Sequence, residues 1–121
     1  MPFQRPAFRA DKLTAARNAA GLSRATVADR LGVARSRVHA WETGEATPHA
    51  RHIPALARLL GVAATTYAPG DDLRARRYRA GLTQAEAAAQ VGAARPEWSR
   101  WESGLRIPDR HAAAVARLLS S

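Results

Sequence analysis

Arginines are the residues of this chain best equipped for chemistry, because a guanidinium group binds anions through several N–H donors. Lys12 is the only lysine among 19 basic residues, and 10 acidic residues leave a net charge of +9 and a pI near 11.6. Arginines recur in close groups, at Arg35 and Arg37 and again at Arg95 and Arg100. This excess of positive charge predicts a polyanionic partner, either nucleic acid or an anionic membrane surface.

Other kinds of chemistry find no support in the sequence. The absence of cysteine excludes disulfides, thiolate metal sites, zinc fingers and a cysteine nucleophile. The sequence has no Ser/His/Asp set, no paired carboxylates and no glycine-rich phosphate loop, so we expect no enzyme. His49 and His52 have the spacing of a metal-binding pair, but no third ligand accompanies them, and a solvated helix start is the favoured interpretation. We therefore expect no metal and no cofactor.

The composition also bears on cellular location. No apolar run approaches the roughly 18 residues that a membrane span needs, and the N-terminal segment MPFQRPAFRADK has no apolar signal core. We expect a cytoplasmic, nucleoid-associated protein with no membrane partner. Apolar residues make up 46% of the 121 residues, enough for one ordinary core or two very small ones.

The elements that must position the arginines occur twice in the chain. A shift of 60 residues superposes several identical residues: Leu13 on Leu73, Gly32 on Gly92, and Trp41-Glu42 on Trp101-Glu102. After Pro48 and Pro108 one residue is lost, so that ALARLL at 55–60 matches AVARLL at 114–119. This duplication predicts an arm with a first domain at 1–62, a linker at 63–72 and a second domain at 73–121.

Each copy is expected to be all-helical, because alanine is abundant and β-branched residues are sparse. In the first copy we expect helices over about 11–20, 24–31, 35–43 and 50–60, with Ser23 capping the second. The second copy repeats this order; Asp71 or Asp72 can cap its first helix, and Thr83 with Glu86 forms a capping box.

The second and third helices of each copy have the spacing of a helix-turn-helix. In the first copy Ala28 permits close helix packing, Gly32 supplies the positive φ of the turn, and Val38 with Trp41 faces the core. The matching positions of the second copy are Ala88, Gly92, Trp98 and Trp101. We interpret the three tryptophans as core residues and Glu42 and Glu102 as groups that form hydrogen bonds at helix ends.

The two cores differ in size at matching positions. Three residues shrink in the second copy and one grows: Val27, Leu31 and Val33 become Ala87, Val91 and Ala93, while Val38 becomes Trp98. We interpret this as compensation, in which one indole fills the volume that three smaller side chains release. Trp98 is then a structural residue and not a reader of bases.

The segments GLSRATVADRLGVARSRVHAWETGEATP and GLTQAEAAAQVGAARPEWSRWESGLRIP resemble the phage-repressor/Cro-like (XRE) helix-turn-helix family. The likeness covers nearly all of both copies. It implies two tandem lambda-repressor-like helical bundles. It also implies DNA binding, most often for transcriptional control. Our leading hypothesis is therefore a sequence-specific regulator that binds double-stranded DNA and acts as a repressor.

The same resemblance assigns roles to individual residues, because in this family the start of the third helix lies in the major groove. It implies base contacts from exposed residues of that helix: Arg35, Ser36, His39 and Ala40 in the first copy, and Arg95, Ser99 and Arg100 in the second. An arginine there can bind guanine O6 and N7 together. The resemblance implies phosphate contacts from Arg24, Arg37, Gln84 and Arg106.

Several alternatives stay open. In the second copy Pro96 lacks a backbone N–H, and Glu97 either opposes phosphate or accepts from a cytosine amino group. The net charge of residues 63–121 is +3 (9 basic, 6 acidic), whereas that of residues 1–62 is +6 (10 basic, 4 acidic). The first copy is therefore expected to bind DNA more strongly. The second can instead make the chain a protein-interaction adaptor of the antitoxin or coactivator kind. A nucleoid-type binder held by charge alone is the third possibility.

Assembly and the remaining arginines are also undecided. A homodimer or a protein partner is possible, and the linker is long enough for one chain to imitate a dimer on half-sites about 34 Å apart. The group Arg74, Arg76, Arg77 and Arg79 forms either a solvated helix face or a phosphate contact. The arm at 1–10, with Arg5 and Arg9, either enters a minor groove or frays.

Overall fold

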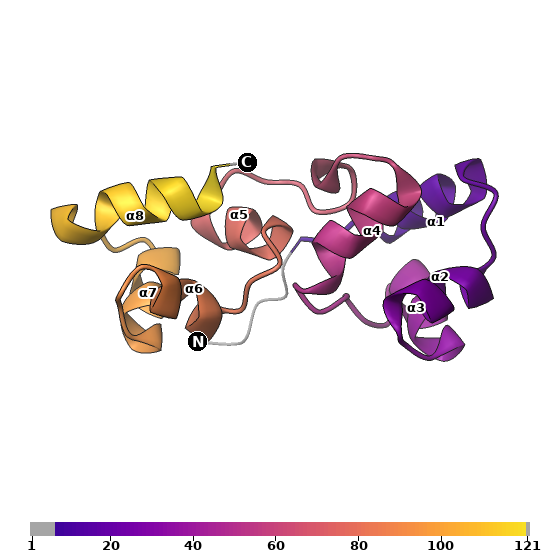
Figure 1. Ribbon diagram of the computed structural model, residues 1–121, viewed down its shortest axis with the longest axis horizontal. Helices are drawn as coiled ribbons and strands as arrows, with labels where there is room; N and C mark the ends of the chain where they lie inside the picture. The colour runs from indigo at the N-terminus through magenta and orange to yellow at the C-terminus, as the bar shows by residue number, and fades with distance from the viewer. Residues whose placement is uncertain (1–6, 121) are drawn as a thin grey trace.

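The computed structural model describes residues 7–120, so Arg5 of the predicted arm lies outside the described residues. Within that range the chain contains eight α-helices, one short 3-10 helix and no strand. The first copy contains α1 (Ala10–Ala19), α2 (Arg24–Leu31), α3 (Arg35–Thr43), α4 (His52–Leu60) and the 3-10 helix η1 (Ala64–Thr66). The second contains α5 (Leu73–Arg79), α6 (Gln84–Gln90), α7 (Arg95–Glu102) and α8 (Asp109–Leu119). The chain forms two four-helix units, as the duplication predicts, and these units lie end to end (Figure 1).

Local sequence signals set the helix starts and turns. The Ser23 hydroxyl accepts from the Thr26 N–H at 3.1 Å, and the Asp72 carboxylate accepts from the Ala75 N–H at 2.9 Å. Both hydrogen bonds of the capping box between Thr83 and Glu86 are present. Gly32 ends α2 in the left-handed conformation, at φ 71°, so that α3 can turn back onto α2.

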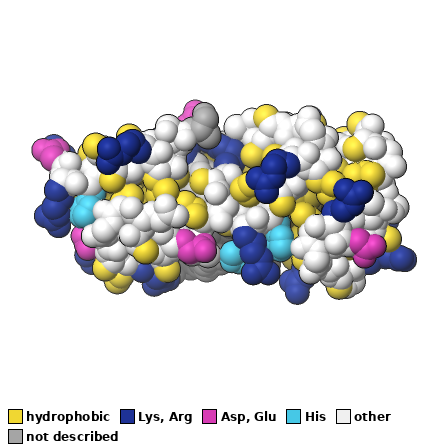
Figure 2. All heavy atoms as spheres, viewed as in Figure 1, with side chains coloured by type: hydrophobic (Ala, Val, Ile, Leu, Met, Phe, Trp, Pro, Cys, Tyr) yellow, Lys and Arg dark blue, Asp and Glu magenta, His cyan; other side chains and the backbone are white. Residues whose placement is uncertain are grey.

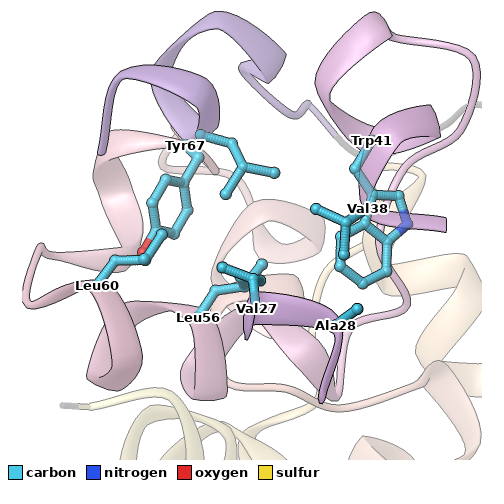
Figure 3. Packing of buried hydrophobic residues seen from close by; sticks show 8 residues of the cluster. Val27, Ala28, Val38, Trp41, Leu56, Leu60 and Tyr67 are labelled. Carbon is cyan, nitrogen blue, oxygen red and sulfur yellow. The ribbon is translucent and has the colours of Figure 1, made fainter. Parts of the chain in front are cut away.

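The core of the first copy gathers side chains from all four of its helices. Val27, Val38, Leu56 and Tyr67 are fully buried, and Trp41 is nearly so. Figure 3 shows Trp41 of α3 and Tyr67 on either side of Val27 and Leu56. The predicted core role of Val38 and Trp41 is therefore confirmed.

The core of the second copy is built around an indole. Trp98 is fully buried and packs in one cluster with Ala87, Val91 and Ala93. The Trp98 and Trp101 rings lie 5.6 Å apart between centroids. The predicted core role of Trp98 is confirmed, and the indole shares one cluster with the three positions that became smaller; that it fills the volume they release stays a prediction.

The segment 63–72, expected to be a linker, begins as a folded extension of the first copy. It forms η1, and the Tyr67 ring packs against Phe8 at 6.3 Å between centroids. Tyr67 and Ala68 are buried. Burial of Tyr67 raises its pKa to about 12. The two copies are therefore joined by a shorter connection than a ten-residue spacer.

A third apolar cluster lies where the copies meet, and we call it the junction cluster. It consists of Ala50 and Ile53 from the first copy, Ala68 from the connection and Tyr78 from α5. The Tyr78 hydroxyl donates to the Pro48 carbonyl at 2.6 Å in a buried position. In the part of the chain that the structure describes, no helix has the length and apolarity to cross a membrane.

Candidate nucleic-acid interface

Helix α3 presents a polar face because its other face is fixed in the core. Val38 and Trp41, three residues apart, hold α3 against α2 and α1. The residues between them and before them point outward: Arg35, Ser36, Arg37 and His39 are exposed, and Ala40 is half-buried. All four predicted base-contacting residues of the first copy thus lie on one helix, and three of them are exposed.

Helix α7 is fixed in the same way by Trp98 and Trp101. Arg95 and Arg100 are exposed and Ser99 is half-buried, so the structure also brings the predicted residues of the second copy together. Figure 1 shows the α2/α3 pair and the α6/α7 pair on the same lower side of the molecule.

A buried carboxylate holds α3 to the helices behind it. The Glu42 side chain is only 2% exposed and accepts hydrogen bonds from Arg17 Nε at 2.6 Å and from Thr14 Oγ1 at 3.1 Å. Arg17 also donates to the Leu22 carbonyl at 2.9 Å, just before α2. Arg24, a predicted phosphate contact, donates from Nε to Glu42 at 3.1 Å and keeps 43% of its side chain exposed.

The second copy repeats this arrangement around Glu102. Arg77 pairs with that carboxylate and donates to the Leu82 carbonyl at 2.9 Å. Gln84 Nε2 and Trp98 Nε1 complete the site at 2.9 and 2.6 Å. Glu42 and Glu102 are thus hydrogen-bonding groups at helix ends, as predicted.

The arginine group of α5 is not a uniform solvated face, which corrects one expectation. Arg77 is buried because its charge is matched by Glu102. Arg74 lies 3.5 Å from the same carboxylate. Arg79 donates to the carbonyls of Ala68 and Gly70 at 2.8 and 2.6 Å, and Arg76 alone of the four is exposed. Sequence reasoning missed Arg17 and Arg77 as the residues that support the exposed helices.

Opposing effects set the pKa of each buried carboxyl. Burial by itself raises the pKa of Glu42, but hydrogen bonds from Arg17 and Arg24 outweigh it and hold the pKa below its ordinary value. For Glu102, burial is again the largest effect, and Arg77 and Gln84 reverse it, so that its pKa is also lowered. Both side chains are therefore charged at neutral pH.

A cleft of about 1350 Å³ separates the exposed helices. It is lined by the start of α3, the turn before α4, and the starts of α6 and α7. Arg37 and Arg51 enter it from the first copy and Arg95 from the second. Figure 2 shows basic and histidine side chains gathered at the lower edge between the two halves. The arrangement suits a polyanion that passes along this face.

A family model described as a helix-turn-helix domain matches residues 10–68 and again residues 70–120. The chain belongs to this helix-turn-helix family. Membership indicates DNA binding and points to transcription regulation. No curated protein and no solved structure matches the chain. The finer resemblance to phage repressors and Cro stays a prediction.

Within the helix-turn-helix frame, α3 and α7 are the third helices that were expected to face DNA. Arg106, a predicted phosphate contact, lies in the loop after α7 and pairs with Asp109 at 3.1 Å, with both side chains more than 80% exposed. Glu97 accepts from the Ala94 N–H at 3.1 Å and lies 3.8 Å from Arg110. It therefore supports the start of α7 from within the chain.

The two histidines expected at a solvated helix start differ from each other. His52 is buried against the Trp41 ring, 5.4 Å away between centroids, which corrects the expectation for that residue. Burial lowers the His52 pKa, and the charges of Arg51, His49 and Arg37 add to the effect. His49 is exposed, and its Nδ1 accepts from the Arg51 N–H at 3.1 Å. Among the described residues no group of three or more potential ligands could hold a metal ion.

Arg51 is a candidate that sequence reasoning missed. Its side chain is exposed and lines the cleft together with Arg37, although 14 positions separate the two in the sequence. The sequence shows a basic residue soon after Pro48, but only the fold places Arg51 near the start of α3.

Proposed function

We propose that the protein is a sequence-specific double-stranded DNA-binding regulator of transcription that reads the major groove with α3, and with α7 to a lesser degree. The observation that carries the proposal is the outward position of Arg35 on a helix whose opposite face is buried through Val38 and Trp41. A helix of this kind fits the major groove, and one bidentate arginine–guanine contact is worth about 1–3 kcal/mol of discrimination.

Positive charge supplies the second part of the proposal. Arg37 on α3 and Arg51 before α4 line the cleft, where they can contact the phosphates of DNA bound by α3. Phosphate contacts of this kind release counterions and give most of the affinity without sequence preference. Base contacts from the helices then choose the site.

Repression is the mode of regulation that this arrangement favours. A protein that occupies its site tightly excludes other proteins from the same stretch of DNA, and this needs no enzymatic activity and no cofactor. We therefore propose a repressor whose effect depends on occupancy alone.

Selection from random duplexes with the full chain tests the proposal. We expect a consensus to emerge that includes a guanine whose enrichment depends on Arg35. Binding that is equally strong on every sequence and is lost with salt would instead describe a charge-driven architectural protein.

A protein-interaction adaptor is the second candidate, and the start of α7 favours it. Glu97 places a carboxylate where Arg37 stands in the first copy, and Pro96 removes a backbone donor. The matched variants Arg35→Ala and Arg95→Ala distinguish the candidates. If Arg35→Ala weakens DNA binding and Arg95→Ala has no effect on any sequence, α7 is free to dock a protein; if both weaken it, both copies bind DNA.

A further inference from the structure

The two copies meet through unlike surfaces. The last helix of the first copy, α4, packs against the first helix of the second copy, α5, and Ile53 and Tyr78 share the junction cluster. A two-fold dimer would use the same surface twice, whereas a head-to-tail contact joins two different surfaces. Figure 1 shows the same relation: from right to left, α1 precedes α4 in one half and α5 precedes α8 in the other. The copies are thus related more nearly by translation than by a two-fold axis.

The junction holds the copies together by close packing. Ile53 is fully buried and Tyr78 is 2% exposed. A Cβ added to Gly81 would lie 2.8 Å from Cγ of Pro54, so the second copy's turn touches α4 directly. The hydrogen bond from Tyr78 to the Pro48 carbonyl crosses the same boundary.

The outer ends of the molecule lack the residues that make this contact. At the free end of the second copy, Ala112 stands where Ile53 stands in the first, and it is exposed. At the free end of the first copy, exposed Asn18 stands where Tyr78 stands in the second. A Cβ added to Gly21, the counterpart of Gly81, would have no other atom within 4 Å. A head-to-tail contact that could otherwise continue from chain to chain therefore stops after two copies.

We propose that one chain meets duplex DNA as a preassembled unit, with α3 and α7 on two unequal half-sites in the same orientation and at one fixed spacing. This inference rests on the proposed function, since it names the form of the DNA site. It differs from the arrangement of a two-fold dimer, which binds two half-sites in opposite orientations. The order of the helices along the molecule fixes the orientation of the half-sites.

A variant in which α7 carries the same DNA-facing residues as α3 tests the orientation of the half-sites, because both copies should then select the same bases. Four substitutions give α7 the residues that α3 carries at the matching positions outside the core: Pro96→Ser, Glu97→Arg, Ser99→His and Arg100→Ala. Selection from random duplexes with this full-length variant should enrich two like half-sites in direct repeat, bound by one chain per duplex. An inverted repeat, or two chains per duplex, would overturn the inference and leave the proposed function standing. No enrichment with either the variant or the wild-type chain would overturn both.

The spacing of the half-sites tests the fixed junction independently. Inserting half a turn, about five base pairs, between them should lower the affinity of the wild-type chain roughly 100-fold, because only one copy can then engage its half-site. The paired substitution Ile53→Ala with Tyr78→Asn installs the outer-end residues at the junction and leaves both separate cores intact. Provided that its melting curve shows both copies folded, the affinity of this variant for the duplex should fall less than about 10-fold when the same five base pairs are inserted. Equal affinity of the wild-type chain for both spacings would contradict a fixed junction.

Discussion

Arginines of equal charge have two distinct roles in this chain. Arg17 and Arg77 are buried and bind a carboxylate behind the exposed helices. Arg35 and Arg95 lie in the first turn of those helices and are exposed. The first pair therefore bears on stability and the second on recognition, and substitutions separate the two.

Replacing Arg35 by Ala should weaken binding to the preferred duplex by about 1–3 kcal/mol and relax the choice of one base, because the bidentate contact is lost. The measurement is a titration of the preferred duplex and of single-base variants. As a control, Arg117→Ala removes the same charge from an exposed position on α8 and should leave the base preference unchanged. An equal loss on every duplex would show that Arg35 touches only phosphate.

Replacing Glu42 by Gln should lower the free energy of unfolding by about 3–5 kcal/mol, since it leaves the buried Arg17 charge without its partner. Urea unfolding measures the change. Asp11→Asn is the matched control, because Asp11 pairs with Arg9 at 3.1 Å with both side chains more than half exposed. Exposed pairs of this kind contribute about 0–1 kcal/mol, and an equal effect of both substitutions would contradict the role of Glu42.

Acid should unfold the protein through the same carboxylates. Because the folded-state pKa values of Glu42 and Glu102 lie below the ordinary value of 4.5, their stabilisation is complete above about pH 4.5 and is lost as the pH falls through the folded-state values. Unfolding midpoints measured from pH 7 to pH 2 should therefore decrease steeply below pH 4.5. The double variant Glu42→Gln with Glu102→Gln should be less stable at neutral pH, and its unfolding midpoint should depend less steeply on pH.

At the scale of whole elements, α3 and α7 are equivalent helices held by cores of different design. Val38 shares a core cluster with Val27 in the first copy, whereas Trp98 shares one with Ala87 in the second and also donates to Glu102. The same outward presentation is thus reached by two ways of filling the volume beneath the helix.

Exchanging these two core residues should destabilise both copies for opposite reasons. Trp98→Val leaves a cavity and removes one of the hydrogen bonds to Glu102, with a loss approaching the roughly 3–5 kcal/mol of a buried Trp truncation. Val38→Trp overpacks the first copy, at about 1–3 kcal/mol. Hydrogen exchange resolved by segment should show lost protection in α6 and α7 for the first variant and in α2 and α3 for the second. Wild-type protection in either case would mean that its core tolerates the change.

Sequence patterns predicted these elements well where the signal is local. The ends of α3, the turn at Gly32 and the capping box at Thr83 follow from residues within a few positions of each other. The core role of Trp98 was predictable because a duplicated chain supplies its own comparison. The family resemblance implied the outward position of Arg35, and the spacing of Val38 and Trp41 on the buried face agrees with it.

Contacts between distant residues were beyond sequence reasoning. Arg17 and Glu42 are 25 positions apart, and no pattern distinguishes Arg77 from its three neighbouring arginines. The sequence predicts a solvated His52, whereas its contact with Trp41 depends on how the fold places the start of α4 near the end of α3. Tyr67 lies in a stretch of turn residues without helical periodicity, so the sequence does not indicate which core its ring packs against.

At the scale of the whole molecule, the connection between the copies determines how they act. A ten-residue spacer would let each copy find its own half-site, whereas the packed junction of Ile53 and Tyr78 sets one arrangement. The net charge of +9 then acts over both copies at once. Affinity should fall as salt rises, and each phosphate contact should make the slope of log affinity against log salt more negative by about 0.9.

The affinity ratio between a selected duplex and a permuted duplex of the same composition tests the central claim most directly. Measured with the full chain at about 0.15 M salt, the ratio should reach roughly 10³ or more, as base reading by an exposed helix requires. A ratio near one, with affinity that falls steeply with salt on both duplexes, would contradict sequence-specific recognition.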